Sequence, residues 1–134
     1  MKQKRTMASQ AKIVKHWNLT HDTTFDNTYC WGCGQKSDNL HRAHLLAHSA
    51  GGSGEEDNLI LLCWFCHCAI QEPLSSNQSD ADYVKKLILD GLPFFRIHWA
   101  FYAEKIKSGL YDNTCLTHVG ISNNDLENFK KYAK

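Results

Sequence analysis

The sequence predicts an α+β domain in which a small two-stranded hairpin and a helix are stapled by zinc and flanked by further helices. Two Cys-x-x-Cys pairs bracket two short apolar runs that a glycine-rich segment separates. Helical periodicity occurs before the first pair and again after the second. The 134 residues, 43% of them hydrophobic, suffice for one modest core but not for two independent domains.

The composition excludes several classes of protein. The formal net charge is only +1, from 15 Lys and Arg against 14 Asp and Glu, and the aromatic content of 11% argues against a disordered chain. No apolar run approaches the roughly 20 residues that a membrane helix needs, so we expect no membrane partner. The basic start is not followed by an apolar stretch, so we expect no secretory signal and a reducing, cytoplasmic location.

The N-terminal part, 1–25, is predicted to be a basic arm with a short helix over 8–17. Ile13, Val14 and Trp17 fall on one side of that helix. Residues 1–20 contain five basic side chains and no acidic one. The arm is either a frayed, solvated terminus or a contact for nucleic-acid phosphates, and the sequence leaves both open. Its basic residues are Lys2, Lys4, Arg5, Lys12 and Lys15.

Four cysteines form two pairs with the spacing of a zinc site. They are Cys30 and Cys33, then Cys63 and Cys66, with 29 residues between the pairs. Each pair projects two thiolates from one tight turn, and two turns complete a tetrahedral shell for Zn²⁺. Two disulfides or a redox motif are the alternatives, and a reducing compartment favours zinc. The remaining Cys68 and Cys115 are expected to be free thiols, buried rather than reactive.

The region 26–73 is predicted to be the core. Its first strand covers 40–46, its glycine-rich loop 49–58 and its second, buried strand 58–62. A helix beginning at Phe65 and reaching about residue 71 carries His67.

The region 74–134 is predicted to be a helical extension packed with the core as one domain. Helices are expected over 80–90, ending at Gly91, over 93–107, and from the N-cap Ser122. Recurrence at helical spacing favours a core role for the aromatic residues over a base-stacking one. The expected core positions are Tyr83, Leu87 and Ile88, then Phe94, Ile97 and Phe101, then Leu126, Phe129 and Tyr132.

Three short motifs coincide in one stretch of about 40 residues. They are CWGC from Cys30, RAHLLAHSAGGS from Arg42 and DNLILLCWFCH ending at His67. In this combination the sequence resembles the HNH endonuclease family, in the four-cysteine zinc branch of the His-Me finger (ββα-metal) nucleases. The resemblance implies a ββα-metal core that hydrolyses DNA phosphodiester bonds, by nicking or double-strand cleavage, in a bacterial or phage-infected cell.

The resemblance also implies the roles of three side chains. His44 would be the general base that activates water, which suits an imidazole because it takes up a proton near neutral pH. Asn58 would orient the catalytic loop and the histidine, since its amide is both donor and acceptor. His67 would bind a catalytic divalent metal, Mg²⁺, Mn²⁺ or another ion, whereas the cysteine-bound zinc would be structural.

One position departs from the family pattern. Many members have Asp or His before the general base as a second metal ligand, and here that residue is Ala43. His41 lies on the same strand face but about 6–7 Å further along the strand, so we expect it to be a poor substitute. His48 is another candidate helper. For both we favour a solvated or phosphate-contacting histidine.

DNA is the expected partner. Arg42 is a candidate phosphate contact, with an ion pair to Glu55, Glu56 or Asp57 as the equal alternative. Residues 40–72 sum to −3, so affinity would come from the basic arm or from the C-terminal lysines. Double-strand cleavage would require two copies, which leaves a homodimer open. The alternative function is a catalytically inactive zinc-stabilised module that binds DNA or protein.

Overall fold

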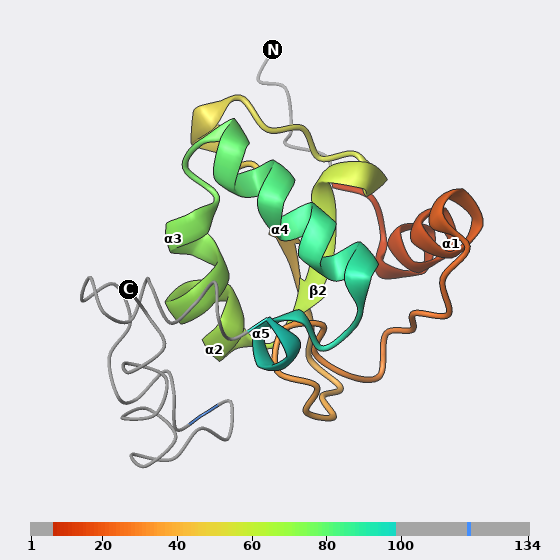
Figure 1. The fold of residues 1–134 in the computed structure, drawn as a ribbon. Coiled ribbons are helices and arrows are strands. Elements are labelled where there is room, and N and C mark those ends of the chain that lie inside the picture. The colour runs from red at the N-terminus through yellow and green to blue at the C-terminus, as the bar shows by residue number, and fades with distance from the viewer. Residues whose placement is uncertain (1–6, 99–117, 119–134) are drawn as a thin grey trace.

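The computed structural model describes residues 7–98 and residue 118 (Figure 1). Several predicted features lie outside the described residues: the arm residues Lys2, Lys4 and Arg5, Cys115, the helix from Ser122, and the part of the 93–107 helix beyond residue 98. The described elements are α1 (Gln10–His21), β1 (His41–His44), η1 (His48–Ala50), η2 (Glu56–Asn58), β2 (Leu59–Leu62), α2 (Trp64–Cys66), η3 (His67–Gln71), α3 (Glu72–Leu74), α4 (Gln78–Asp90) and α5 (Phe94–Ile97).

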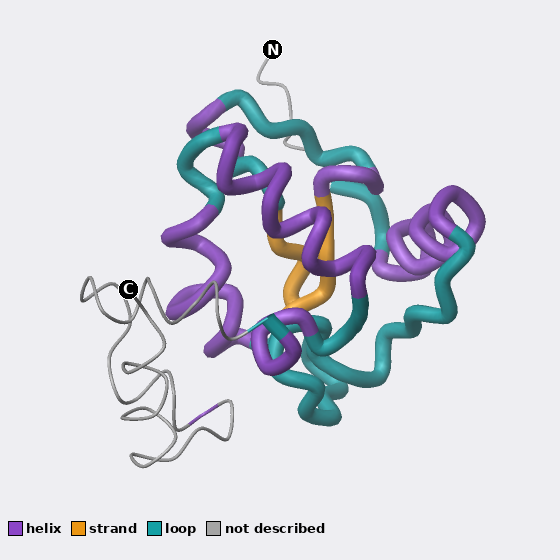
Figure 2. Tube along the Cα trace, viewed as in Figure 1, coloured by secondary structure: helices purple, strands orange, loops and turns teal. Residues whose placement is uncertain are grey.

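The two strands form an antiparallel hairpin in which His41 is paired with Leu62 and His44 with Leu59. All four residues of β2 are buried, as the apolar run LILL requires. Both predicted strands are present but shorter than expected. Figure 2 shows the hairpin in orange, surrounded by helices in purple.

A helical segment follows β2 directly and completes a ββα order. It runs through α2, η3 and α3, and η3 has π-helical hydrogen bonding. The Sγ atom of Cys63 caps its start by accepting a hydrogen bond from the amide of Cys66. Ile70 and Leu74 bury the inner face of the segment in the core. The predicted α+β class is therefore confirmed, and the arrangement is consistent with a ββα-metal fold.

Helix α1 is tied to the start of β2 by a buried indole. Ser9 caps the helix through a bond from the amide of Lys12, and Ile13 and Trp17 are fully buried. Nε1 of Trp17 donates to the carbonyls of Glu56, at 3.1 Å, and Leu59, at 2.9 Å. The basic N-terminal helix thus packs beside the hairpin, where Figure 1 shows α1.

Helix α4 crosses the view in front of β2 in Figure 1. Asn77 caps it by accepting a hydrogen bond from the amide of Asp80 at 2.8 Å, and it ends before Gly91 as predicted. Its buried residues are Ala81, Val84, Leu87 and Ile88. The prediction that Tyr83 belongs to the core is wrong, because Tyr83 lies off that face and is 43% exposed.

The short helix α5 closes over the first cysteine turn. The amides of Phe94 and Phe95 donate to the carbonyls of Trp31 and Gly32, both at 3.0 Å, and both phenyl rings are fully buried. Ile97 was expected in the core, but it follows these two anchors on the outer side and is 51% exposed.

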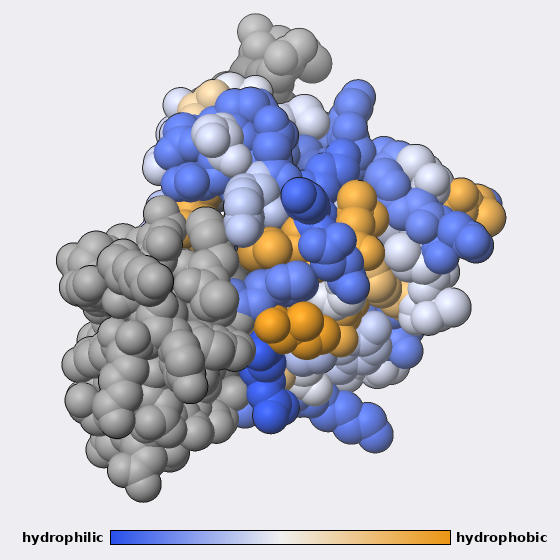
Figure 3. Space-filling view, in the orientation of Figure 1, coloured by the Kyte–Doolittle hydropathy of each residue, from blue (hydrophilic) through white to orange (hydrophobic). Residues whose placement is uncertain are grey.

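The surface in Figure 3 is mainly hydrophilic, with small separate hydrophobic areas. Among the described residues, no helix combines the length and apolar character that crossing a bilayer would require.

Candidate metal centre and catalytic site

The four predicted zinc ligands converge on one point. The Sγ atoms of Cys30, Cys33, Cys63 and Cys66 all lie within 4.8 Å of one another. Each turn aims backbone amides at its own sulfur: Gly32 donates to Cys30 Sγ at 3.3 Å and Cys66 to Cys63 Sγ at 3.5 Å. All four cysteines are free of disulfides, so the disulfide alternative does not hold.

The cluster has the electrostatics of a cation site. Hydrogen bonding to Cys30, then to the other thiols, together with burial, raises the pKa of Cys66 above its usual range. Hydrogen bonding from Cys33 lowers the pKa of Cys30 to about 7. Four sulfurs this close therefore cannot all ionise without a cation, and a tetrahedral set of four thiolates is a closed, structural zinc site.

The glycines of the first turn are needed for its shape. Gly34 has a φ of +79°, and its amide donates to the carbonyl of Cys30 at 2.8 Å. A beta carbon added at Gly32 would lie too close to the Leu62 side chain, which would have to shift.

A histidine that cysteine spacing does not predict lies beside the cluster. Nε2 of His118 lies 3.3 Å from Cys63 Sγ and 3.9 Å from Cys33 Sγ. Its ring stacks on Phe65 with centroids 4.2 Å apart, and its carbonyl accepts a bond from Gln35 at 2.8 Å. No spacing signal pointed to it, because 51 residues separate it from the last cysteine of the cluster.

His44 and His67 line one cavity of about 340 Å³. His44 comes from the end of β1, and its carbonyl accepts a 2.6 Å bond from Nε2 of the buried Gln71. His67 comes from the first turn of η3, where its amide donates to the carbonyl of Cys63 at 2.9 Å. Strand and helix thus present the predicted base and the predicted metal ligand to the same space. Gln71 was not foreseen, although it lies one helical turn after His67.

Burial is the main influence on His67. Its side chain is 22% exposed, and burial lowers the pKa of its imidazole, with a further lowering from His41 and an opposing effect of Glu72. The neutral ring is therefore favoured, which is the form that binds a metal.

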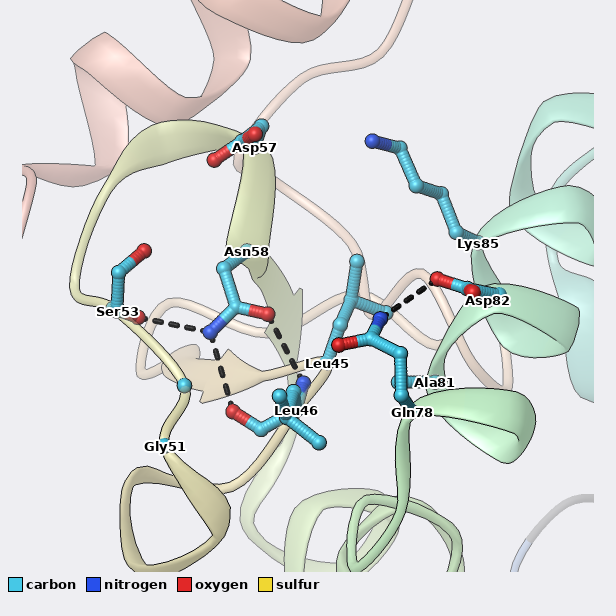
Figure 4. A pocket seen from close by; sticks show the side chains of 11 residues that line it. Leu45, Leu46, Gly51, Ser53, Asp57, Asn58, Gln78, Ala81, Asp82 and Lys85 are labelled. Atoms are coloured by element: carbon cyan, nitrogen blue, oxygen red, sulfur yellow. Dashed lines mark hydrogen bonds between the residues drawn. The ribbon is translucent and has the colours of Figure 1, made fainter.

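Asn58 holds the loop that follows His44 (Figure 4). Its Oδ1 accepts from the amide of Leu46 at 2.9 Å, while its Nδ2 donates to the carbonyls of Leu46, at 3.1 Å, and Ser53, at 2.7 Å. Its own carbonyl accepts from the amide of Leu45 at 2.8 Å. The side chain does not contact the His44 ring in these bonds. Asn58 thus fixes the two residues that follow His44, Leu45 through its main-chain carbonyl and Leu46 through its side chain.

A glycine allows the same loop to close. A beta carbon at Gly52 would overlap the carbonyl oxygen of Leu46, so only glycine fits there. A second hollow of about 290 Å³ lies beside this loop, between Asn58 and the helix α4 residues Gln78 and Asp82 (Figure 4).

Of the two histidines considered as substitutes at Ala43, His41 has different surroundings from those predicted. Ala43 is fully buried and offers no ligand. His41 is half-buried, and its Nδ1 lies 3.2 Å from Nδ1 of His67, so it is not the solvated histidine that we favoured. His48 is exposed in η1, with its ring centroid 6.5 Å from that of His44.

Within the described residues, Arg42 does not form the predicted ion pair with Glu55, Glu56 or Asp57. Its Nη1 donates to the carbonyls of Ala8, at 3.1 Å, and Met7, at 3.3 Å. The guanidinium therefore ties β1 to the segment before α1. Lys12 and Lys15 are exposed on α1.

Residues 28–72 match the family model described as HNH endonuclease. This segment is an HNH domain. The HNH domain runs from just before the first cysteine turn to the start of α3, so it contains the zinc ligands, Asn58 and the three histidines that line the cavity, His44, His48 and His67. Neither a curated protein nor a solved structure matches the chain significantly. The HNH domain supports a nuclease-like function in general.

Proposed function

We propose that this protein is a DNA endonuclease that hydrolyses phosphodiester bonds with a divalent metal. The observation that carries the proposal is the cavity that His44 and His67 share inside the HNH domain. One imidazole comes from the strand and the other from the helix, which provides a proton acceptor and a metal ligand for one substrate.

His44 acts as the general base. Its place at the cavity wall allows its ring to take a proton from a water that attacks the phosphorus atom. The bond from Gln71 Nε2 to the His44 carbonyl fixes the end of the strand against the helix. Asn58 holds the amides of Leu45 and Leu46, so the same peptide group and the residue after it are fixed as well. A base whose following backbone is anchored in this way loses little entropy in reaching its reactive position.

His67 holds the catalytic divalent metal. A divalent cation in this position supplies stabilisation of the charge that develops on the phosphate and its leaving oxygen. The zinc turn determines where His67 points, since the His67 amide is bonded to the carbonyl of Cys63. The structural cysteines thereby support the chemistry without taking part in it.

The backbone of DNA would be bound by basic residues outside the acidic core. Lys12 and Lys15 are exposed on α1, next to the hairpin, and Lys86 is exposed on α4. Contacts of this kind are independent of sequence and weaken as salt rises.

A plasmid assay tests the proposal. Zinc-loaded protein is incubated with supercoiled DNA and Mg²⁺, Mn²⁺ or Ni²⁺, and parallel samples contain EDTA. We expect metal-dependent conversion to nicked or linear DNA, lost in His44→Ala and His67→Ala but retained in His16→Ala, which lies on α1 outside the cavity. DNA binding without cleavage in every metal would favour the inactive zinc module instead.

A further inference from the structure

The residue before the proposed general base in the HNH domain, Ala43, offers no ligand atom to a catalytic cation. Ala43 is fully buried against the helical segment. The described histidines provide one side chain close enough to His67 to replace it. That side chain is His41, whose Nδ1 lies 3.2 Å from Nδ1 of His67.

We infer that His41 and His67 bind the divalent cation together, each through its Nδ1 atom. The biological use of this pair depends on the proposed nuclease function, but the binding itself does not. A metal ion bonded to imidazole nitrogen at about 2.0–2.1 Å holds two such nitrogens about 2.8–3.4 Å apart, from the octahedral to the tetrahedral angle between neighbouring ligands. The observed separation of 3.2 Å falls inside that range.

The register of the hairpin explains why His41 reaches this position. His41 is paired with Leu62, the last residue before Cys63, so it lies at the end of the hairpin where the zinc turn begins. His67 starts from the same turn through its bond to the Cys63 carbonyl. His41 is two residues from Ala43 along the strand, yet its ring lies next to that of His67. Strand pairing and the zinc turn therefore bring the two residues to the same end of the hairpin.

The far edge of the His67 ring supports the same assignment. Its Nε2, the ring nitrogen that does not contact His41, lies 4.0 Å from a carboxylate oxygen of Glu72. A carboxylate behind a metal-binding imidazole favours the proton on the nitrogen that it faces, which leaves the other nitrogen with a free lone pair. For His67 the nitrogen left with the lone pair is Nδ1, the atom that faces His41.

The two rings are nearly perpendicular, with an interplanar angle of 81° and centroids 5.4 Å apart. They are therefore not stacked on each other, and an ion can lie on the edges that carry both Nδ1 atoms. Two imidazole ligands favour Mn²⁺, Co²⁺, Ni²⁺ or Zn²⁺ over Mg²⁺, which prefers oxygen ligands. The proposed pair therefore selects a transition metal.

Calorimetric titration of the zinc-loaded protein with Ni²⁺ tests this inference without DNA. We expect one site beyond the structural zinc, and a loss of Ni²⁺ affinity of at least about tenfold in His41→Ala, since removal of even an outer partner costs 10–100-fold. His67→Ala and the double variant should lose the same site. His16→Ala is the matched control on α1 and should bind Ni²⁺ as the wild type does.

Zinc content and circular dichroism establish that each variant is folded. Nitrogen-15 spectra of the histidine rings, recorded while a diamagnetic ion such as Cd²⁺ fills the second site, should show both Nδ1 atoms shifted and the proton of His67 retained on Nε2. Unchanged Ni²⁺ affinity in folded His41→Ala would overturn the inference and identify the contact as a hydrogen bond between imidazoles. Absence of plasmid cleavage by the wild type would overturn the proposed function but not the metal pair.

Discussion

Substitution of Asn58 by alanine probes the part of the HNH domain that fixes the backbone after His44. The change removes three side-chain hydrogen bonds, two to Leu46 and one to Ser53. The bond from the amide of Leu45 to the Asn58 carbonyl is a main-chain bond and remains. The hairpin should therefore persist, while the loop after it loses its side-chain clamp.

The expected loss in the free energy of unfolding follows from these three bonds. Each hydrogen bond contributes about 0.5–1.5 kcal/mol to the free energy of unfolding, which gives about 1.5–4.5 kcal/mol for three. The Ser53 side of the clamp is exposed, where water can replace the amide, so we expect about 2–3 kcal/mol. A domain of ordinary stability, about 5–15 kcal/mol, remains folded after such a loss.

Urea denaturation of the zinc-loaded protein measures this difference. Asn39→Ala, at an exposed position before β1, is the matched control and should stay within about 0.5 kcal/mol of the wild type. Asn58→Asp keeps an acceptor for the Leu46 amide but turns a carboxylate oxygen toward two carbonyls, so it should be no more stable than Asn58→Ala. An Asn58→Ala protein as stable as the control would refute the claim that the Asn58 side chain stabilises this loop.

Three further predictions concern the metal cluster and the helix α1. Cys63→Ser should yield a protein that binds no zinc and shows no cooperative unfolding by circular dichroism. Cys68→Ser, which changes an exposed cysteine outside the cluster, should fold normally. A folded, zinc-free Cys63→Ser protein would contradict the structural role of the zinc. His118→Ala should release zinc to a chromophoric chelator about 10–100 times faster, because a ring nitrogen beside the Cys63 sulfur is lost. An unchanged rate of zinc release would show that this contact does not affect the ion. Burial, then the charge of Lys85, lowers the pKa of His21 from 6.5, so its contribution to stability is complete above that pH and declines as the pH falls through it. Urea titrations at about pH 7.5 and 5.5 should therefore show a smaller decline for His21→Gln than for the wild type, and equal declines would refute the assignment.

Local chemistry explains why so much of the core could be predicted. Cysteine spacing, two short apolar runs and a helix start after Cys63 are all encoded within a few neighbouring residues. The strands are shorter than predicted because the amide of Leu46 is bonded to the Asn58 side chain instead of continuing the ladder. That side-chain bond joins residues 12 positions apart, so the pattern of apolar residues along the chain does not predict it.

Side chains whose partners are distant in sequence were harder to predict. Cys68 was expected to be buried, and this is wrong: it is exposed, on the outer side of the segment that buries Ile70 and Leu74. Arg42 bonds to carbonyls 34 and 35 positions earlier, and His41 contacts His67 across the hairpin. Such pairs depend on how the elements pack, which periodicity does not determine.

The central claim is that His44 is the base of a metal-dependent nuclease, and one rate ratio tests it most directly. Single-turnover nicking of supercoiled DNA is measured for wild type and His44→Ala, both zinc-loaded and saturated with Mn²⁺. Removal of a general base should lower the rate about 10²–10⁴-fold while zinc content and DNA binding are unchanged. A ratio close to one, or no metal-dependent nicking by the wild type, would contradict the account.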